Sequence, residues 1–357
     1  MKHQHKNISR RLAAAMMAGT MMVSMVGMTA FAEGDPITSL PISKIVTTDG
    51  DTYAPATSFE FTVDNGAAIE DFNDGKNIVD VTGGVTGGLT GTTITSVPTT
   101  TSDDVVVEPA DSYTFSGSLA VNISAFQKPG VYHYVVTETE GDYEGIAYSE
   151  ESYDVYVYVV NANNEGTVFK VDAVIAFKNG SKVSDVTFTN NYGEGSNNST
   201  HDVTVTKVLA GTMANMSDTF SFTVGVKGAS GEAYKIVYTQ KGISATTYVM
   251  SNGTTTLTGI GHNDTITIYG LTANDTYIVT ETDGTSQGYT VSDSVKTDAA
   301  GTVSGKVTDD NTNETIINTK DAVTPTGIAM TIAPYVIMVV AAAGVAFLFL
   351  RRRNSEF

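Results

Sequence analysis

The stretch VTVTKVLAG, residues 203–211, has the alternating pattern of a β-strand with one residue out of place. Successive side chains of a strand point to opposite faces of its sheet, so one face carries Val203, Val205, Lys207 and Leu209. That face is apolar apart from the lysine. A single lysine at such a position can reach solvent along its apolar stem, so this strand alone would indicate nothing unusual.

The same exception recurs on five other predicted strands. A lysine interrupts the apolar face of PISKIVTT (41–48), and a glutamate does so in YHYVVTET (132–139) and YIVTET (277–282). An asparagine does so in VTFTNNY (186–192) and ETIINT (314–319). The polar residues concerned are Lys44, Glu138 and Asn190 in the first half of the chain and Lys207, Glu281 and Asn318 in the second.

Each half of the chain therefore directs one lysine, one glutamate and one asparagine at its own core, in the same order. Asn190 is selected over the adjacent Asn191 because only Asn190 shares the face of Phe188. Burial of a lone ammonium or carboxylate costs several kcal/mol. Two explanations are open: a buried Lys–Glu ion pair with the asparagine as a bystander, or a reaction that removes the charges.

A reaction between these three residue types is chemically reasonable. Burial lowers the pKa of a lysine and raises that of a carboxyl, so a proton can pass between them and leave a neutral, nucleophilic amine. The protonated carboxyl can then hydrogen-bond the amide oxygen of the asparagine, polarise its carbon and give a proton to the departing ammonia. The product is an uncharged Lys–Asn isopeptide bond, and the recurrence of the triplet favours this explanation over the ion pair.

Both ends of the chain indicate export. Residues 1–32 combine a basic start, an apolar stretch and the small-residue pattern Ala30-Phe31-Ala32, which is typical of a cleaved signal peptide. An uncleaved membrane anchor is the alternative. At the other end, residues 328–350 form an apolar run followed by three arginines, as expected of a transmembrane helix with its tail in the cytoplasm. VTPTG (323–327) directly precedes this run.

The exported part is acidic and has no cysteine. Four of the 20 basic residues lie in the leader and three in the tail, and one of the 39 acidic residues is in the tail, so the remainder has a net charge near −25. Such acidity disfavours nucleic acid and anionic membranes as partners. Without cysteine, a secreted chain must obtain any covalent reinforcement from chemistry other than disulfides.

The composition predicts an all-β protein with two tandem sandwich domains. Threonine, valine and tyrosine are abundant and apolar runs are short, which favours strands. The polar joint GEGSNNST (193–200) separates a domain over residues 33–192 from one over 201–322, ahead of the C-terminal signal (323–357). The Gly/Thr-rich segment 81–104 is weakly patterned and is expected to be a mobile insertion or loose edge strands.

Several segments resemble a known family. SFEFTV, FQKPGVYHYVVTET, YSEESYDVYVYVVN and VTFTNNY resemble the N-terminal isopeptide-linkage domain of streptococcal-type backbone pilins of Gram-positive bacteria. Residues 259–292 are similar to the Cna-B-like domain that follows it in many such proteins. The resemblance implies two Ig-like or Cna-B-like sandwiches, each with an autocatalytic isopeptide bond: Lys44 to Asn190 assisted by Glu138, and Lys207 to Asn318 assisted by Glu281.

The C-terminal segment resembles a sortase sorting signal in the variant typical of pilins, although Val323 and Thr324 stand where the commonest form has Leu-Pro. The resemblance implies cleavage between Thr326 and Gly327 and transfer of the threonine to a lysine of a neighbouring copy, Lys182 ahead of Lys178. It implies a pilin-type sortase, further copies of this chain, minor pilins and peptidoglycan as partners, and a location in the cell wall or pilus. No cofactor, metal or enzymatic turnover is expected.

Two other functions are alternatives for an exported β protein. The first is an adhesin, anchored singly to the wall or at a pilus tip, which binds host protein or glycan; no dedicated binding domain is recognisable. The second is a secreted hydrolase with β accessory domains, for which no region of the chain is left. HExxH, P-loop and dinucleotide patterns do not occur in the sequence.

Overall fold

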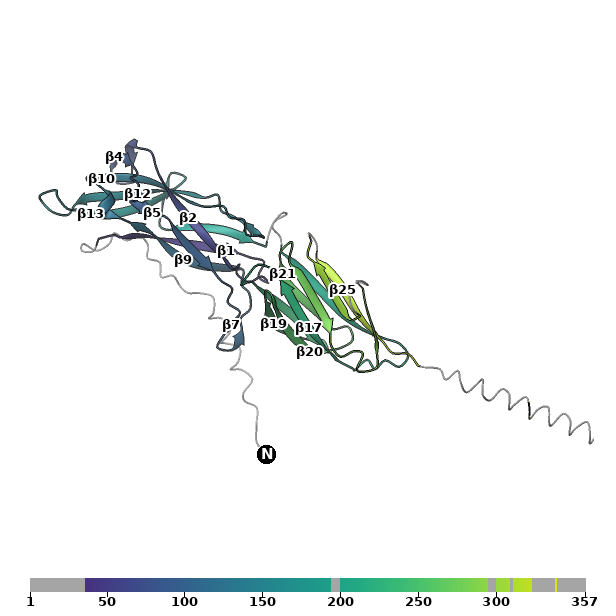
Figure 1. Cartoon of the computed structure of the whole chain (residues 1–357). Coiled ribbons are helices and arrows are strands. Elements are labelled where there is room, and N and C mark those ends of the chain that lie inside the picture. The colour runs from purple at the N-terminus through teal and green to yellow at the C-terminus, as the bar shows by residue number, and fades with distance from the viewer. Residues whose placement is uncertain (1–35, 194–199, 295–299, 309–310, 323–337, 339–357) are drawn as a thin grey trace, which may run out of the picture.

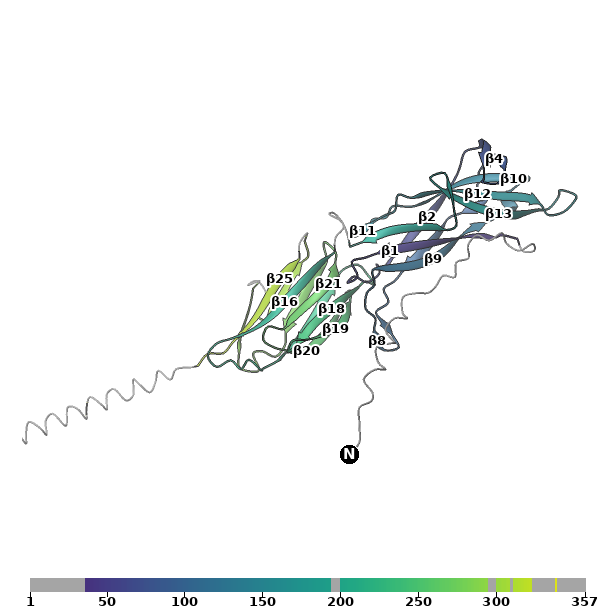
Figure 2. The same ribbon diagram turned by 180° about the vertical axis from the view of Figure 1, so that it is seen from behind.

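The computed structural model describes residues 36–193, 200–294, 300–308, 311–322 and 338 of the 357-residue chain. The predicted signal peptide and the sorting signal, with Thr326 and Gly327, lie outside these residues, and so does the predicted membrane segment apart from Met338. Across the described ranges we find no helix long and apolar enough to cross a membrane. Figures 1 and 2 show two elongated lobes of strands that meet end to end.

The described residues up to 193 form the N-terminal domain, and those from 200 to 322 form the C-terminal domain. The N-terminal strands are β1 (Ser39–Thr47), β2 (Thr57–Asn65), β3 (Ile69–Asn73), β4 (Ile78–Gly83), β5 (Leu89–Thr90), β6 (Thr92–Ser96), β7 (Thr101–Ser102), β8 (Val105–Val106), β9 (Ser112–Val121), β10 (Gly130–Glu138), β11 (Ile146–Ala147), β12 (Ser152–Asn161), β13 (Phe169–Lys178), β14 (Ser181–Val183) and β15 (Val186–Tyr192), with a 3-10 helix η1 (Ile123–Ala125). The C-terminal strands are β16 (His201–Ala210), β17 (Phe220–Lys227), β18 (Ala233–Gln240), β19 (Ile243–Met250), β20 (Gly253–Ile260), β21 (Thr265–Leu271), β22 (Thr276–Glu281), β23 (Thr290–Asp293), β24 (Thr302–Lys306) and β25 (Thr312–Thr319).

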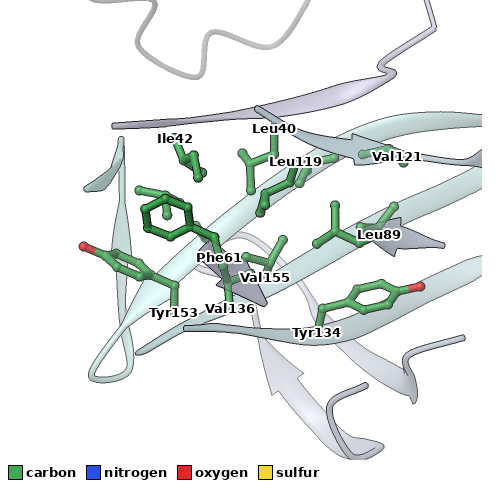
Figure 3. Packing of buried hydrophobic residues seen from close by; sticks show 14 of the residues in the cluster. Leu40, Ile42, Phe61, Leu89, Leu119, Val121, Tyr134, Val136, Tyr153 and Val155 are labelled. Atoms are coloured by element: carbon green, nitrogen blue, oxygen red, sulfur yellow. The ribbon is translucent and has the colours of Figure 1, made fainter. Parts of the chain in front are cut away.

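The N-terminal domain is a sandwich of two sheets. One has the strand order β11-β15-β1-β9-β5, and the other has the order β14-β13-β12-β10-β2-β6 with β4 also paired to β10. Alternating residues of the two sheets face each other: Leu40 and Ile42 from β1 lie opposite Phe61, Val136 and Val155 (Figure 3). Burial of these apolar faces is the main force that holds the sheets together.

The C-terminal domain repeats the plan with different strand numbers. Its sheets have the orders β19-β18-β21-β16-β25-β23 and β20-β17-β22-β24, and they enclose a second apolar core. In both domains the first and last long strands are adjacent and parallel, β1 with β15 and β16 with β25. The expected all-β class with tandem domains is confirmed.

About half of the weakly patterned segment 81–104 lies in short strands. β5 pairs with β9, and β6 pairs with β2 at the end of its sheet. The β3–β4 hairpin overlaps the start of the segment and joins the larger sheet through the pairing of β4 with β10, and its Phe72 stacks on Tyr156 with the ring centroids 4.2 Å apart. Of the two expectations for this segment, edge strands describe what the structure contains.

Candidate crosslinking sites

The pairing of β1 with β15 brings Lys44 and Asn190 to one face of their sheet. In this parallel pair Lys44 is opposite Phe188, and Val46 is opposite Asn190. The asparagine therefore lies diagonally from the lysine, two residues beyond its direct partner. Diagonal neighbours of a sheet are within reach of a long side chain, so residues 146 positions apart in the chain can meet.

Glu138 reaches the same point from the opposite sheet, because it is the last residue of β10. Its Oε2 accepts a hydrogen bond from Lys44 Nζ at 2.7 Å, and its Oε1 accepts one from Asn190 Nδ2 at 2.8 Å. The side chains of Lys44 and Glu138 are both fully buried. A single carboxylate thus bridges the amine and the amide in an interior that excludes water.

The C-terminal domain contains the same arrangement with the same register. Lys207 is opposite Ile316, and the asparagine again lies two residues further on, at position 318. Lys207 Nζ donates to Glu281 Oε2 at 2.7 Å, and Asn318 Nδ2 donates to Glu281 Oε1 at 2.5 Å. The structure therefore brings together all six residues predicted from the alternation, in two groups of three.

An aromatic ring covers the amine at each site. Lys44 Nζ lies 4.7 Å from the ring centre of Phe59, and Lys207 Nζ lies 4.7 Å from that of Phe220. Burial lowers the pKa of Lys44 to about 8 despite the opposing influence of Glu138, and burial also lowers the pKa of Lys207. With a pKa of about 8, roughly a tenth of the Lys44 amines are neutral at neutral pH, a far larger fraction than for a lysine in water.

The amide oxygens of Asn190 and Asn318 do not contact the glutamates, although the proposed reaction predicts that the carboxyl would hydrogen-bond them. Each glutamate contacts the amide nitrogen, while Asn190 Oδ1 accepts a hydrogen bond of 2.8 Å from the backbone N–H of Ser149. In the part of the chain that the structure describes, Asn318 Oδ1 is buried without a hydrogen-bond partner. The group that can polarise the carbonyl of Asn190 is thus a backbone N–H. Such a contact cannot be predicted from the pattern of side chains in the sequence.

Gly284, like the N–H of Ser149, is part of a site but cannot be predicted from the alternation pattern. A Cβ at this position would lie 2.1 Å from Glu281 Oε1 and 2.7 Å from Asn318 Nδ2. The bare backbone therefore packs directly against the carboxylate and the amide, and glycine is needed for lack of space. Phe59 and Phe220 could have been found from the sequence, because SFEFTV and TFSFTV repeat one pattern in the two domains.

The two candidate intersubunit lysines have different surroundings. Lys178 donates to Glu151 at 2.5 Å and lies 5.5 Å from the ring centre of Tyr153, and this hydrogen bond is among the causes that raise its pKa. Lys182 lies on the edge strand β14 and is exposed, and no salt bridge of it is found among the described residues. The amine of Lys182 is therefore the more accessible of the two.

Each of the two domains matches a known family model. Residues 40–193 match the family model of the Spy0128-like isopeptide containing domain. Residues 201–320 match a domain family of unknown function, DUF7601, so the Cna-B-like character of this domain remains a prediction. A pilin of Streptococcus pyogenes serotype M1 is 28% identical over 326 residues, which cover 84% of this chain and 86% of that protein.

Solved structures agree with this match. The crystal structure of a mutant of the major pilin from S. pyogenes is 25% identical, with a TM-score of 0.54 over 80% of this chain and 99% of that one. The major pilin T3.2 of the same species, at 21% identity and a TM-score of 0.55, shares the fold.

The tandem β domains and these similarities define the class: the chain is a structural subunit of a pilus. More particularly, residues 40–193 match the Spy0128-like isopeptide containing domain, and the chain as a whole is similar to the pilin of S. pyogenes serotype M1.

Proposed function

We propose that this chain forms the shaft of a Gram-positive pilus, that it crosslinks itself through Lys44–Asn190 and Lys207–Asn318, and that a sortase polymerises it. The observation that carries the proposal is the repeated cluster in which one buried carboxylate touches both an amine and an amide. A buried ion pair would need only the lysine and the glutamate, whereas the same diagonal placement of an asparagine in both domains is what the reaction requires.

The reaction begins with proton transfer from the ammonium of Lys44 to the carboxylate of Glu138 across their hydrogen bond of 2.7 Å. The neutral amine attacks Cγ of Asn190, whose carbonyl is polarised by the N–H of Ser149. A C–N bond forms, a proton of the amine reaches the amide nitrogen through the carboxyl, and the old C–N bond breaks. One ammonia leaves, and the carboxyl keeps the proton that it took from the lysine.

The low polarity of the site favours the product. Two buried ions and a primary amide are replaced by one neutral amide and a neutral carboxyl, which removes the desolvation cost of the charges. Lys207, Glu281 and Asn318 support the same proton transfer, attack and loss of ammonia in the C-terminal domain, although among the described residues no donor to Asn318 Oδ1 corresponds to the N–H of Ser149. Each chain performs the reaction once per domain, so the protein is not a turnover enzyme.

The crosslinks would make each domain resistant to pulling. A bond between the first and last strands connects the point where tension enters a domain to the point where it leaves, so the sheets between them need not unzip. The bond also restricts the unfolded chain. By analogy with a disulfide that closes a loop of this size, the stabilisation is about 4 to 5 kcal/mol per bond.

Polymerisation would join Thr326 of one subunit to the amine of Lys182 on the next. The support is the sorting pattern VTPTG and the exposure of Lys182 on an edge strand, in contrast to the ion-paired Lys178. Sortase then also attaches the base of the polymer to peptidoglycan.

The proposed function is tested with wall extracts of cells that express the chain with a pilin sortase. After boiling in detergent, we expect a regular ladder of covalent multimers, because amide links resist this treatment. A matched chain in which residues 323–327 are scrambled should give monomer alone. A single wild-type band at monomer mass would contradict polymerisation and favour a singly anchored adhesin.

A further inference from the structure

A second buried polar cluster lies where the two domains meet, away from both crosslinking sites. Its centre is a pair of carboxylates of the C-terminal domain, Glu232 and Asp275, each only 4% exposed. Among the residues that the structure describes, neither carboxylate forms a salt bridge. Two buried anions side by side without a cation are costly, which favours a proton on one of them.

Glu232 makes hydrogen bonds that join the two domains. Tyr143 of the N-terminal domain donates its hydroxyl to Glu232 Oε1 at 2.6 Å, and the hydroxyl of Tyr192 lies 3.5 Å from the same oxygen. Tyr192 is the last residue of β15, two residues after Asn190. The strand that carries the crosslinking asparagine therefore ends directly on this cluster.

A count of hydrogens shows that one proton is missing if both acids are ionised. The hydroxyl oxygen of Tyr234 lies 2.5 Å from Glu232 Oε2 and 3.1 Å from Asp275 Oδ2. A tyrosine hydroxyl has one hydrogen and can donate it to only one of them. The backbone N–H of Thr272 donates to Asp275 Oδ2 at 2.9 Å. This hydrogen does not lie between Asp275 Oδ2 and the Tyr234 oxygen, so that contact still needs a hydrogen of its own.

We propose that Asp275 is protonated in mildly acidic solution and that the hydrogen-bonded chain from Asp275 through Tyr234 and Glu232 to Tyr143 is a proton-dependent lock between the two domains. In this chain Asp275 donates to the Tyr234 oxygen, Tyr234 donates to Glu232, and Glu232 stays ionised and accepts from Tyr143. Every short contact then contains one hydrogen, and only one negative charge is buried. The lock does not depend on the crosslinking reaction.

The electrostatics agree with this assignment. Burial, and next the charge of Glu232, raise the pKa of Asp275 to about 7. The groups that face Asp275 and Glu232 are the hydroxyls of Tyr143, Tyr192 and Tyr234, and burial raises the pKa of each of them, so they remain protonated donors. Asp275 therefore titrates near neutral pH.

The direction of the pH effect follows from the raised pKa. An aspartate in the unfolded chain has a pKa of about 3.9, so the folded protein holds this proton over a range in which the unfolded chain has lost it. The stability that the proton contributes is complete below about pH 4 and falls as the pH rises to about 7. Above that pH, two adjacent anions weaken the lock.

Other charges at the contact provide a control. Lys235 pairs with Asp51 and Glu108 of the N-terminal domain at 2.9 Å each. Burial and the charges of Asp49 and Asp51 raise the pKa of Asp202 to about 6. Asp202 also titrates near this range but lies outside the hydrogen-bonded chain, so Asp202→Asn is the matched control for Asp275→Asn.

The test measures how rigidly the domains are joined as a function of pH. Because the chain has no cysteine, spin labels can be attached through Ser118→Cys on β9 and Thr256→Cys on β20, both exposed, in residues 33–326. Pulsed electron paramagnetic resonance then gives the distance distribution between the domains. We expect a narrow distribution at about pH 6 that broadens at about pH 8.5, with a midpoint near the Asp275 pKa of about 7.

Three variants distinguish the lock from a merely structural contact. Asp275→Asn should stay narrow at both pH values, because its amide donates permanently to Tyr234, and Tyr143→Phe should be broad at both. Asp202→Asn should keep the wild-type transition. The proposal is overturned if the wild-type width does not change with pH, if the transition survives in Asp275→Asn, or if Asp202→Asn abolishes it. Circular dichroism of each variant at both pH values separates domain motion from unfolding.

Discussion

Glu281→Gln is expected to leave the C-terminal domain without its internal crosslink and to lower its free energy of unfolding by at least about 4 kcal/mol, the value for loss of a covalent loop of this size. Glutamine has nearly the same volume, but it cannot take the proton of Lys207, so the amine stays charged and does not attack Asn318. The variant also buries the ammonium without its anionic partner at 2.7 Å, which adds to the loss.

This expectation is checked by mass and by thermal unfolding of the same sample. The variant should retain one ammonia more than the wild type, while the N-terminal domain should keep its own crosslink through the intact Glu138. Glu314→Gln is the matched control, because this carboxylate lies on β25 of the same domain and bonds to the surface residue Ser294. A Glu281→Gln chain that still lacks one ammonia per domain would contradict the proposed role of the carboxylate.

Lys182→Arg is expected to abolish the ladder of multimers and to leave the monomer with both internal crosslinks. Arginine keeps the positive charge and the length of the side chain, but its guanidinium stays protonated and cannot act as the nucleophile. The fold should be unaffected, because Lys182 is an exposed residue on the edge strand β14. The loss should be complete rather than partial, since each polymer joint uses this amine.

Lys178→Arg is the matched control for polymerisation. This residue is four positions away and paired with Glu151, an interaction that arginine can preserve. Electrophoresis of wall extracts should show the normal ladder for Lys178→Arg and monomer for Lys182→Arg. The opposite pattern would move the intersubunit link to Lys178, and ladders from both variants would contradict a link through either lysine.

The fold class and the six clustered residues could be predicted because period-2 alternation is a strong signal where one face of a strand is buried. The alternation places Lys207 on one face with three apolar residues, and it places Asn190 on the same face as Phe188. The alternation says which face a residue occupies but not which strand lies beside it. The common two-residue offset between lysine and asparagine in the parallel pairs thus emerged from the structure alone.

Other features were beyond sequence patterns for a physical reason. The N–H of Ser149 belongs to the backbone, and its contact with Asn190 depends on the path of a loop. Gly284 matters because of what surrounds it, not because of its neighbours in the chain. The contact of Tyr143 with Glu232 joins two domains, and a short motif carries no information on how domains meet.

The most direct test of the central claim is the intact mass of the mature wild-type chain, followed by peptide mapping. We expect a mass lower than that of the sequence by two ammonia molecules, with one pair of linked peptides containing Lys44 and Asn190 and another containing Lys207 and Asn318. A mass equal to that of the unmodified sequence, with all four residues recovered in linear peptides, would show that both clusters are ion pairs and would contradict the account.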